Sequence, residues 1–307
     1  MTRSQWRWLA TVFGVLALSL FVAACGDDEE DGDGAGAAAT TATAAPEPAQ
    51  EFPAGTTMKR IQDKGEIVIG VKYDVPPFGF KNTRTGAIEG FDVDFGKAIA
   101  EKLGVKPKLV EALSDNRIPF ITDGTVDLVL STMTINEERI EEIGFTNPYF
   151  IAHGRILQKK GGDITGVKDL AGKKVCTALG STYEETLKEQ APRADLRLVD
   201  SYSECLELIQ NGAVDAVSTD DVILTGMIIQ DDTLELVKGE DLTTEPYGGG
   251  FKKGDAEFKT FLDGVLKEYT SGGDWAASYE KWLGQYTGEK QSPPTETLQE
   301  ALDGDIS

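Results

Sequence analysis

The chain has 307 residues with 52 acidic and 30 basic side chains, which gives a formal net charge of -22. This length allows two ordinary domains with a sizeable core. The charge argues strongly against nucleic acid or an anionic membrane surface as the main partner, because both require a basic face. It does not exclude a bound anion, because charges are screened beyond roughly 8 Å at physiological salt and a local cationic pocket decides such binding.

The N-terminus is predicted to be a targeting segment. Two basic residues, Arg3 and Arg7, precede an apolar run from Leu9 to Ala24. The run is shorter than the ~20 residues of a membrane helix but suits a signal peptide. The small residues before Cys25 resemble a bacterial lipobox, in which the cysteine is acylated and becomes the mature N-terminus. We therefore expect a lipoprotein signal peptide over residues 1–24; the alternative is an uncleaved anchor with an incidental cysteine.

Two segments that flank the predicted folded part have low complexity or turn-rich composition. Residues 25–57 begin at the acylated cysteine and contain an acidic run followed by an Ala/Thr/Pro/Gly-rich stretch, which predicts a disordered tether. Residues 287–307 contain Pro293-Pro294 and are predicted to form a flexible tail.

The two remaining cysteines, Cys176 and Cys205, are expected to form a disulfide in an exported, oxidising compartment. Closing a loop of about 30 residues would contribute about 3–4 kcal/mol by the chain-entropy estimate. The alternative is a pair of buried, unpaired thiols.

The part between the flanking segments alternates short apolar strands with helical patterns, which predicts parallel α/β sheets. A final helix carries an apolar stripe from Phe258 to Tyr269, which we assign to the core. The expected strands are 67–71, 108–111, 128–130, 174–178, 196–199 and 216–218, and the expected helices include 94–103 and two that begin near Tyr183 and Ser203.

An internal repeat suggests two similar lobes. The segments 123–129 (DGTVDLV) and 211–217 (NGAVDAV) match at an offset of 88 residues, and each is typical of a helix end followed by a buried strand. In this register Thr132 and Asp220 follow equivalent strands, at the sheet edge where open α/β sheets bind ligands. Chance similarity is the alternative, because Gly-x-Val-Asp is a short pattern.

The residues after these strands suit a free amino acid, which presents a carboxylate and an ammonium group. Thr132 and Thr134 lie just before Arg139, whose guanidinium fits a carboxylate. Asp220 supplies an acid, and the amides of the loop 180–182 can receive an anion's oxygen. Each signal alone is weak, because a single Arg is more often in a surface ion pair and a single Asp more often caps a helix.

Three motifs in order make a family resemblance specific, namely 90–94 (GFDVD), 133–139 (MTINEER) and 145–149 (FTNPY). Over about residues 58–286 the chain resembles the family 3 extracellular solute-binding proteins of polar amino acid importers. The resemblance implies an α/β, two-lobe, type II periplasmic-binding-protein fold with the ligand in the interlobe cleft. We expect lobe 1 to comprise 58–154 and 247–286, and lobe 2 to comprise 155–246.

The same resemblance implies roles for individual residues. Arg139 would bind the ligand α-carboxylate with Thr134 and the loop of Ser181 and Thr182, while Asp220 would bind the α-ammonium with help from Thr132. The acids of the 90–94 motif are expected to be structural.

The side-chain pocket resembles the glutamate/aspartate-binding branch. The segment 114–119 (SDNRIP) implies that Arg117, beside Ser114, reaches a second carboxylate, and Lys72 lies where this branch has another cation. Tyr202 is expected to reach the ligand side chain. Alternatively, Lys72 and Arg117 are ordinary surface charges. Three further segments, including the paired cysteines, resemble actinobacterial glutamate receptors: 175–182, 201–205 and 245–251.

Together these features predict a substrate-binding lipoprotein of an amino acid ABC importer, anchored at the extracellular face of the cytoplasmic membrane. It would bind glutamate, or else aspartate, and deliver it to a membrane permease with its ATPase, without a cofactor or metal. The alternatives are a glutamine/asparagine receptor, a dehydratase-like enzyme on the same scaffold, or a sensor module. The single histidine, His153, argues against most hydrolytic chemistry, and no His/Cys cluster has metal-ligand spacing.

Overall fold

The computed structural model describes residues 50–239, 241–288 and 290–306. The predicted signal peptide, Cys25 and most of the predicted tether lie outside these residues. The described end of the tether differs from the expected disorder, because Phe52 is buried against Phe261 and a helix begins at Thr57. Within the described ranges, no helix combines the length and apolar character needed to cross a bilayer.

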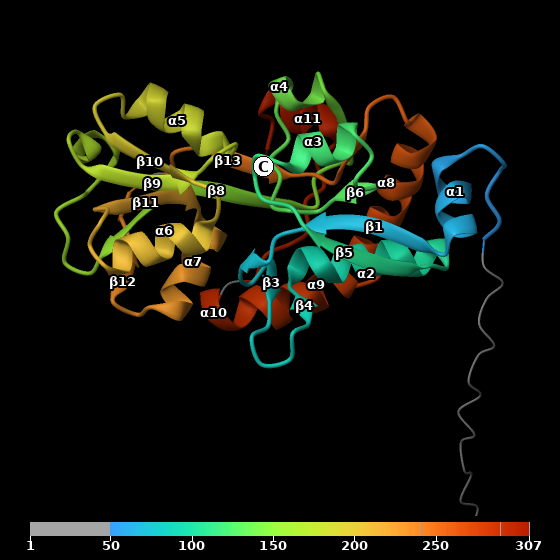
Figure 1. Cartoon of the computed structure of the whole chain (residues 1–307), viewed down its shortest axis with the longest axis horizontal. Coiled ribbons are helices and arrows are strands. Elements are labelled where there is room, and N and C mark those ends of the chain that lie inside the picture. Colours follow the sequence, from blue (N-terminus) through green and yellow to red (C-terminus); the bar gives the residue numbers. More distant parts are fainter. Residues whose placement is uncertain (1–49, 240, 289, 307) are drawn as a thin grey trace, which may run out of the picture. The chain divides into compact units, whose positions relative to one another are not determined.

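Lobe 1 is built on a five-stranded sheet in the order β5–β1–β6–β14–β7 (Figure 1). The first three strands are parallel, whereas β14 runs antiparallel to both of its neighbours. The strands are β1 (Glu66–Val71), β5 (Lys106–Glu111), β6 (Leu128–Val129), β7 (Ile143–Phe145) and β14 (Gly250–Lys252), and a small sheet adds β2 (Asp74–Val75), β3 (Gly79–Lys81) and β4 (Ile88–Glu89).

Helices of lobe 1 come from both ends of the described chain. The long helix α2 begins after Gly90, ends at Gly104 and buries its apolar face, as its pattern predicts. The helices are α1 (Thr57–Lys64), α2 (Phe91–Leu103), α3 (Arg117–Thr122), α4 (Glu137–Ile140), α8 (Ala256–Ser271), α9 (Asp274–Tyr279), the π-helical turn η2 (Glu280–Gly284), α10 (Gln285–Thr287) and α11 (Leu298–Asp303).

Lobe 2 contains the sheet β10–β9–β11–β8–β12, in which β10, β9 and β11 are parallel. Helices α5 and α6 each follow a strand of this sheet. The elements are η1 (Val167–Leu170), β9 (Lys174–Ala178), α5 (Thr182–Gln190), β10 (Asp195–Val199), α6 (Tyr202–Gln210), β11 (Ala216–Asp220), α7 (Asp221–Gln230) and β12 (Leu234–Leu236).

Two antiparallel strands connect the lobes. The ten-residue strand β8 (Phe150–Lys159) pairs along its first part with β13 (Thr244–Tyr247) and along its second part with β11 and β12. The chain therefore leaves lobe 1 along β8 and returns along β13. This is the predicted α/β two-lobe fold, and each expected strand coincides with an observed one within a few residues.

The predicted disulfide is confirmed. Cys176 on β9 and Cys205 on α6 are bonded, with 5.6 Å between their Cα atoms. Both are fully buried, so the bond ties α6 to the lobe 2 sheet from inside.

The C-terminal segment differs from the expected flexible tail. Helix α11 starts at a capping box, in which Thr297 and Glu300 bond each other's backbone amides. Ala301 is buried, and Leu298 and Leu302 pack on the lobe 1 cluster that contains Ile121 and Phe145. The sequence carries this signal, because a Thr-x-x-Glu start is followed by apolar residues at helical spacing.

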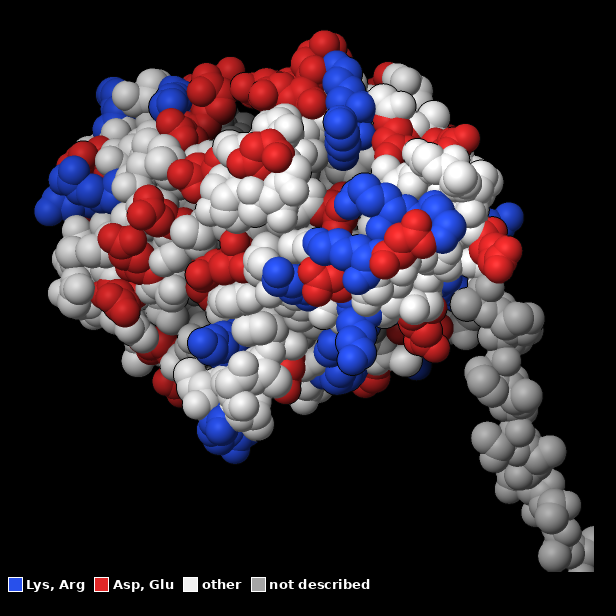
Figure 2. Space-filling model, turned by 45° about the vertical axis from the view of Figure 1, so that its right-hand side comes forward, with Lys and Arg blue, Asp and Glu red and all other residues white. Residues whose placement is uncertain are grey.

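Charge is unevenly distributed over the surface. On the face in Figure 2, basic side chains gather over part of lobe 1, while acidic side chains dominate elsewhere. Exposed basic residues of lobe 1 include Arg60 and Lys64 of α1 and Lys106 and Lys108 of β5.

If α11 is a packed element, Ala301→Asp should lower the free energy of unfolding by about 2 kcal/mol, because it buries a charge without a partner. Chemical denaturation measures this change. The matched control is Gln299→Lys on the exposed side of the same helix, which adds a charge opposite Asp303 without burying it and should change stability by less than about 0.5 kcal/mol. Equal effects of the two variants would contradict the packing.

Candidate ligand-binding cleft

The two lobes enclose a small polar cavity of about 10 Å³, roughly the space of one water molecule. Five residues from each lobe line it: Ser114, Arg117, Thr132, Thr134 and Arg139 from lobe 1, and Ser181, Thr182, Tyr183, Tyr202 and Asp220 from lobe 2. All of these except Tyr183 are predicted ligand residues. A groove of about 610 Å³ shares Ser114, Thr134, Arg139, Ser181 and Thr182 with this cavity.

Arg139 is held on the short helix α4. The side chain of Asn136 accepts a hydrogen bond from the Arg139 amide at 2.9 Å, which fixes the start of this helix. The guanidinium donates to the carbonyl of Thr134 at 2.7 Å and to that of Gly180, across the cleft, at 3.2 Å. Burial lowers the pKa of Arg139. A buried guanidinium whose partners are neutral carbonyls is suited to an incoming carboxylate.

Gly180 makes the closest approach between the lobes at this point. Its φ is +71°, and a Cβ atom there would lie 2.5 Å from the Cα of Asp115 in lobe 1. Both conditions require glycine. The absence of a side chain is what allows the Gly180 carbonyl to receive Arg117 and Arg139 together.

Asp220 lies at the end of β11, on the lobe 2 side of the same cavity. It is 4% exposed and accepts a hydrogen bond from the Tyr183 hydroxyl at 2.8 Å. Burial, followed by repulsion from Glu245, raises the pKa of Asp220 to about 8. A ligand ammonium would relieve both effects, since it supplies the missing positive charge.

Arg117, the first residue of α3, is 2% exposed and is therefore not a surface charge. Its Nε donates to the carbonyl of Ser114, and its Nη1 donates to those of Ser131 and Thr132, each at 3.0 Å. Burial and the neighbouring Arg139 lower its pKa to about 9.

Lys72, at the end of β1, lies directly behind the cavity and is 1% exposed. Its ammonium donates to the Ser114 hydroxyl at 2.7 Å and lies 5.7 Å from the centre of the Tyr202 ring. Burial and repulsion from Arg117 lower its pKa to about 7. Lys72 too is therefore not the ordinary surface charge of the alternative interpretation.

Thr132 has a φ of +44°, in the left-handed region that a β-branched residue rarely adopts. Its amide donates a hydrogen bond to Asp92 at 2.9 Å, and its carbonyl accepts one from Arg117 at 3.0 Å. The peptide groups before and after Thr132 are therefore both held in place. Asp92, from the 90–94 motif, also accepts the Tyr149 hydroxyl at 2.7 Å. Asp92 acts as a support for the cavity wall and does not line the cavity.

Sequence reasoning missed Glu245. This residue on β13 is 2% exposed, and its Oε2 accepts the hydroxyls of Thr134 at 2.5 Å and Thr182 at 3.0 Å. Thr243 donates to Oε1 at 2.6 Å. Glu245 thus occupies two hydroxyls that the family resemblance assigned to the ligand. The only available signal was its place in the 245–251 segment.

The single histidine of the chain lies away from the cavity. His153 lies on β8 outside the cavity, with its Nδ1 3.4 Å from Asp241 Oδ2. A search of the described residues finds no group of three or more His, Cys, Asp or Glu able to hold a metal ion.

A cavity lined equally by two lobes that are joined by two strands defines a two-lobe solute-binding protein. Residues 67–285 match the model of the bacterial extracellular solute-binding proteins, family 3. The chain belongs to this family.

Relatives of different specificity share much of the chain. It is 38% identical over 231 residues to the ABC transporter glutamine-binding protein GlnH of Bacillus subtilis, covering 74% of this chain and 84% of the relative. It is 32% identical over 259 residues to the glutamate-binding protein GluB of Corynebacterium efficiens, covering 80% and 85%.

Solved structures give the same fold. An ancestral arginine-binding protein bound to glutamine has a TM-score of 0.68 and 38% identity, covering 72% of this chain and 98% of that one. The ancestral amino acid-binding protein AncCDT-1, described as a precursor of cyclohexadienyl dehydratase, has a TM-score of 0.67 and 33% identity, covering 74% and 99%.

The raised pKa of Asp220 predicts a pH-dependent cost in the ligand-free protein. Its folded pKa of about 8 exceeds the ordinary value of 3.8, so stability falls as the pH rises between these values. Asp220→Asn should therefore raise the Tm by about 5 °C at pH 8 and by less than half as much at pH 5. Differential scanning calorimetry measures both values.

The control for this test is Asp163→Asn, an exposed acid of lobe 2 whose pKa is lowered by its hydrogen bond to Lys173. This variant should not raise the Tm at either pH. A gain for Asp220→Asn that is the same at pH 5 and pH 8 would contradict the assigned pKa.

Proposed function

We propose that this solute-binding protein takes up a free amino acid between its lobes, with glutamate as its ligand and aspartate as the shorter alternative. The observation that carries the proposal is a cluster of three buried cations, Lys72, Arg117 and Arg139. Among the described residues, none of the three has a carboxylate oxygen within 4.0 Å. A ligand with two carboxylates and one ammonium complements this arrangement.

The binding mode follows from the positions of the charges. The α-carboxylate meets Arg139 and competes with Glu245 for the hydroxyls of Thr134 and Thr182, while the α-ammonium meets Asp220. Ser181 and Thr132 complete the polar wall. The side-chain carboxylate then points toward Lys72 and Arg117, beside Ser114 and Tyr202.

Glutamine is the second candidate, and the similarity to the Bacillus subtilis glutamine-binding protein favours it. The physical basis is the pKa of Lys72, which burial lowers to about 7. A neutral amine donates a hydrogen bond to an amide oxygen and leaves no uncompensated charge. By the same reasoning, asparagine is the amide alternative to aspartate.

Delivery to a membrane permease with its ATPase follows from the family. Because the ligand touches both lobes, it stabilises the closed conformation, which the permease would then recognise. We also propose that Cys25 carries a lipid anchor at the extracellular face of the cytoplasmic membrane. An enzymatic role finds less support, because the AncCDT-1 likeness concerns a binding protein by its own description and His153 lies outside the cavity.

Arg139→Ala should abolish binding of every amino acid, because it removes the partner of a carboxylate that all of them share. Breaking a buried ion pair costs about 3–5 kcal/mol, or several hundredfold in affinity. Isothermal titration calorimetry with glutamate and glutamine tests this prediction. A variant that retains tight binding of either ligand would rule out the proposed mode.

Lys72→Met tests the choice between acid and amide. It keeps a long side chain but removes the cation, so glutamate affinity should fall about a hundredfold or more, while glutamine affinity should fall less than about tenfold. Arg117 is less suited to this test, because its substitution would also free three carbonyl oxygens of the cavity wall.

The matched control is Lys81→Met, which removes an exposed lysine of lobe 1 and should leave both affinities unchanged. Equal losses for glutamate and glutamine in Lys72→Met would contradict an acidic ligand.

A further inference from the structure

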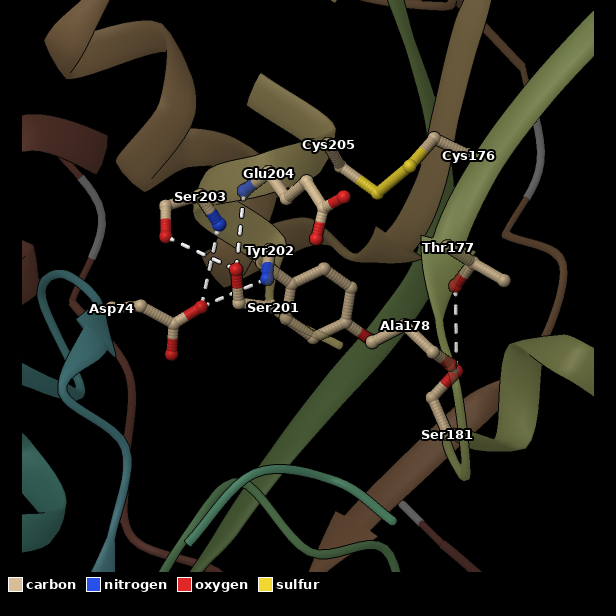
Figure 3. The surroundings of a disulfide bond; sticks show 10 residues. All are labelled: Asp74, Cys176, Thr177, Ala178, Ser181, Ser201, Tyr202, Ser203, Glu204 and Cys205. Carbon is tan, nitrogen blue, oxygen red and sulfur yellow. Dashed lines mark hydrogen bonds between the residues drawn. A yellow bond between two sulfur atoms is a disulfide. The ribbon is translucent and has the colours of Figure 1, made fainter. Parts of the chain in front are cut away.

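We propose that Asp74 is a positioning residue that latches the two lobes together by accepting hydrogen bonds from the N-terminus of α6. The inference rests on the proposed binding between the lobes, and it adds a residue that does not touch the ligand cavity. Figure 3 shows Asp74 facing the first turn of α6, with Tyr202 and the disulfide on the same helix.

The contact joins distant parts of the chain. Asp74 belongs to β2 of lobe 1, and its Oδ2 accepts the amides of Tyr202 at 2.8 Å and Ser203 at 3.3 Å. These residues lie 128 and 129 positions away, in lobe 2. The other carboxylate oxygen of Asp74 is buried without a partner in the described structure. The hydrogen bonds of the Asp74 carboxylate are therefore those that it accepts from lobe 2.

The chemistry at the helix start is complementary. The first amides of a helix have no partner within the helix, and the helix dipole favours a negative charge there. Ser201 caps α6 from its own chain and receives the Glu204 amide at 3.3 Å. The amides of Tyr202 and Ser203 have no partner within the helix, and both donate hydrogen bonds to the Asp74 carboxylate of the opposite lobe. When the lobes part, water replaces this carboxylate, so the contact stabilises the closed conformation specifically.

The disulfide makes the contact effective for the whole of lobe 2. Cys205 lies one turn after Tyr202 and is bonded to Cys176 on β9. Helix α6 therefore cannot shift toward Asp74 without the sheet that carries the cavity residues. Because the Tyr202 side chain lines the cavity, the latch also fixes part of the ligand site.

A second close approach lies at the same seam. Gly226 of α7 in lobe 2 packs so tightly against lobe 1 that a Cβ atom there would lie 1.7 Å from the Pro76 carbonyl oxygen. Gly226→Ala should therefore oppose closure by steric overlap. It provides a reference for a variant that impairs closure without altering any charge.

Asp74 also acts on Lys72 through its charge, and the test must separate this effect. Burial and Arg117 lower the pKa of Lys72, whereas Asp74 acts in the opposite direction. Loss of the Asp74 charge alone would change the affinities for glutamate and glutamine unequally, because it lowers the pKa of Lys72 further and so alters the charge that meets the ligand side chain. Loss of a latch weakens all ligands by the same factor.

The experiment compares Asp74→Ala with Asp74→Asn, which loses the charge but keeps one acceptor oxygen. Calorimetry with glutamate and glutamine should show a five- to tenfold loss for Asp74→Ala, equal for both ligands, about the effect of losing a helix cap. Asp74→Asn should recover affinity to within about threefold of the unmodified protein. The matched control is Asp123→Ala, an exposed acid of lobe 1 that bonds only within its own turn and should change nothing.

A direct measure of closure keeps the test independent of the ligand's identity. Energy transfer between labels at the exposed positions Arg84 in lobe 1 and Arg193 in lobe 2 reports the closed fraction, with and without amino acid. We expect Asp74→Ala and Gly226→Ala to lower it. An unchanged closed fraction, or an Asn variant as impaired as the Ala variant, overturns the latch. Failure of the unmodified protein to bind any amino acid refutes the proposed function instead.

Discussion

The contact between the two lobes buries several charged side chains away from water. The hydrogen bonds of the cleft offset the free-energy cost of this desolvation. Isolated buried charges are strongly unfavourable, so each needs hydrogen bonds or an opposite charge. Arg117 is satisfied largely by backbone carbonyls, which keeps its charge in place without neutralising it. Asp220 has a hydroxyl partner but no cation within 4.0 Å in the described structure. In the ligand-free cleft Arg117 and Arg139 therefore lie buried in lobe 1, while Asp220 in lobe 2, with a pKa of about 8, is largely protonated near pH 7.

The two strands that connect the lobes fix the position of the charged residues of lobe 1 relative to those of lobe 2. Strands β8 and β13 pair with each other, and the rings of Phe150 and Tyr247, one on each strand, stack at 5.8 Å. Trp275 packs on Phe150 and donates from its indole to the Tyr149 carbonyl at 2.7 Å. Such dense aromatic packing resists local deformation. The two connecting strands are thus held firmly at their lobe 1 ends, and Glu245 on β13 pairs with Ala152 of β8.

Much of the fold was predictable because it depends on local patterns. Alternating apolar strands and helices gave the sheets, and the repeat of Gly-x-Val-Asp placed Thr132 and Asp220 at equivalent strand ends, which line one cavity. Roles that depend on the other lobe were not predictable. Asp74 and Glu245 are unremarkable acids in sequence, and their importance comes from partners more than 60 residues away. No periodicity encodes such a pairing, since only tertiary structure brings the partners together.

In the proposed binding mode, selectivity between an acid and an amide depends on the protonation of Lys72. All amino acids share the groups that would meet Arg139 and Asp220, so these two residues would not discriminate between them. Arg117 carries its charge at any physiological pH, since its pKa is about 9, but most of its donors already serve carbonyls. Lys72, with a pKa of about 7, is the cation whose charge a second carboxylate would stabilise and an amide would not. The chain is similar both to a glutamine-binding and to a glutamate-binding protein, so the choice between these ligands for this chain rests on the proposed role of Lys72.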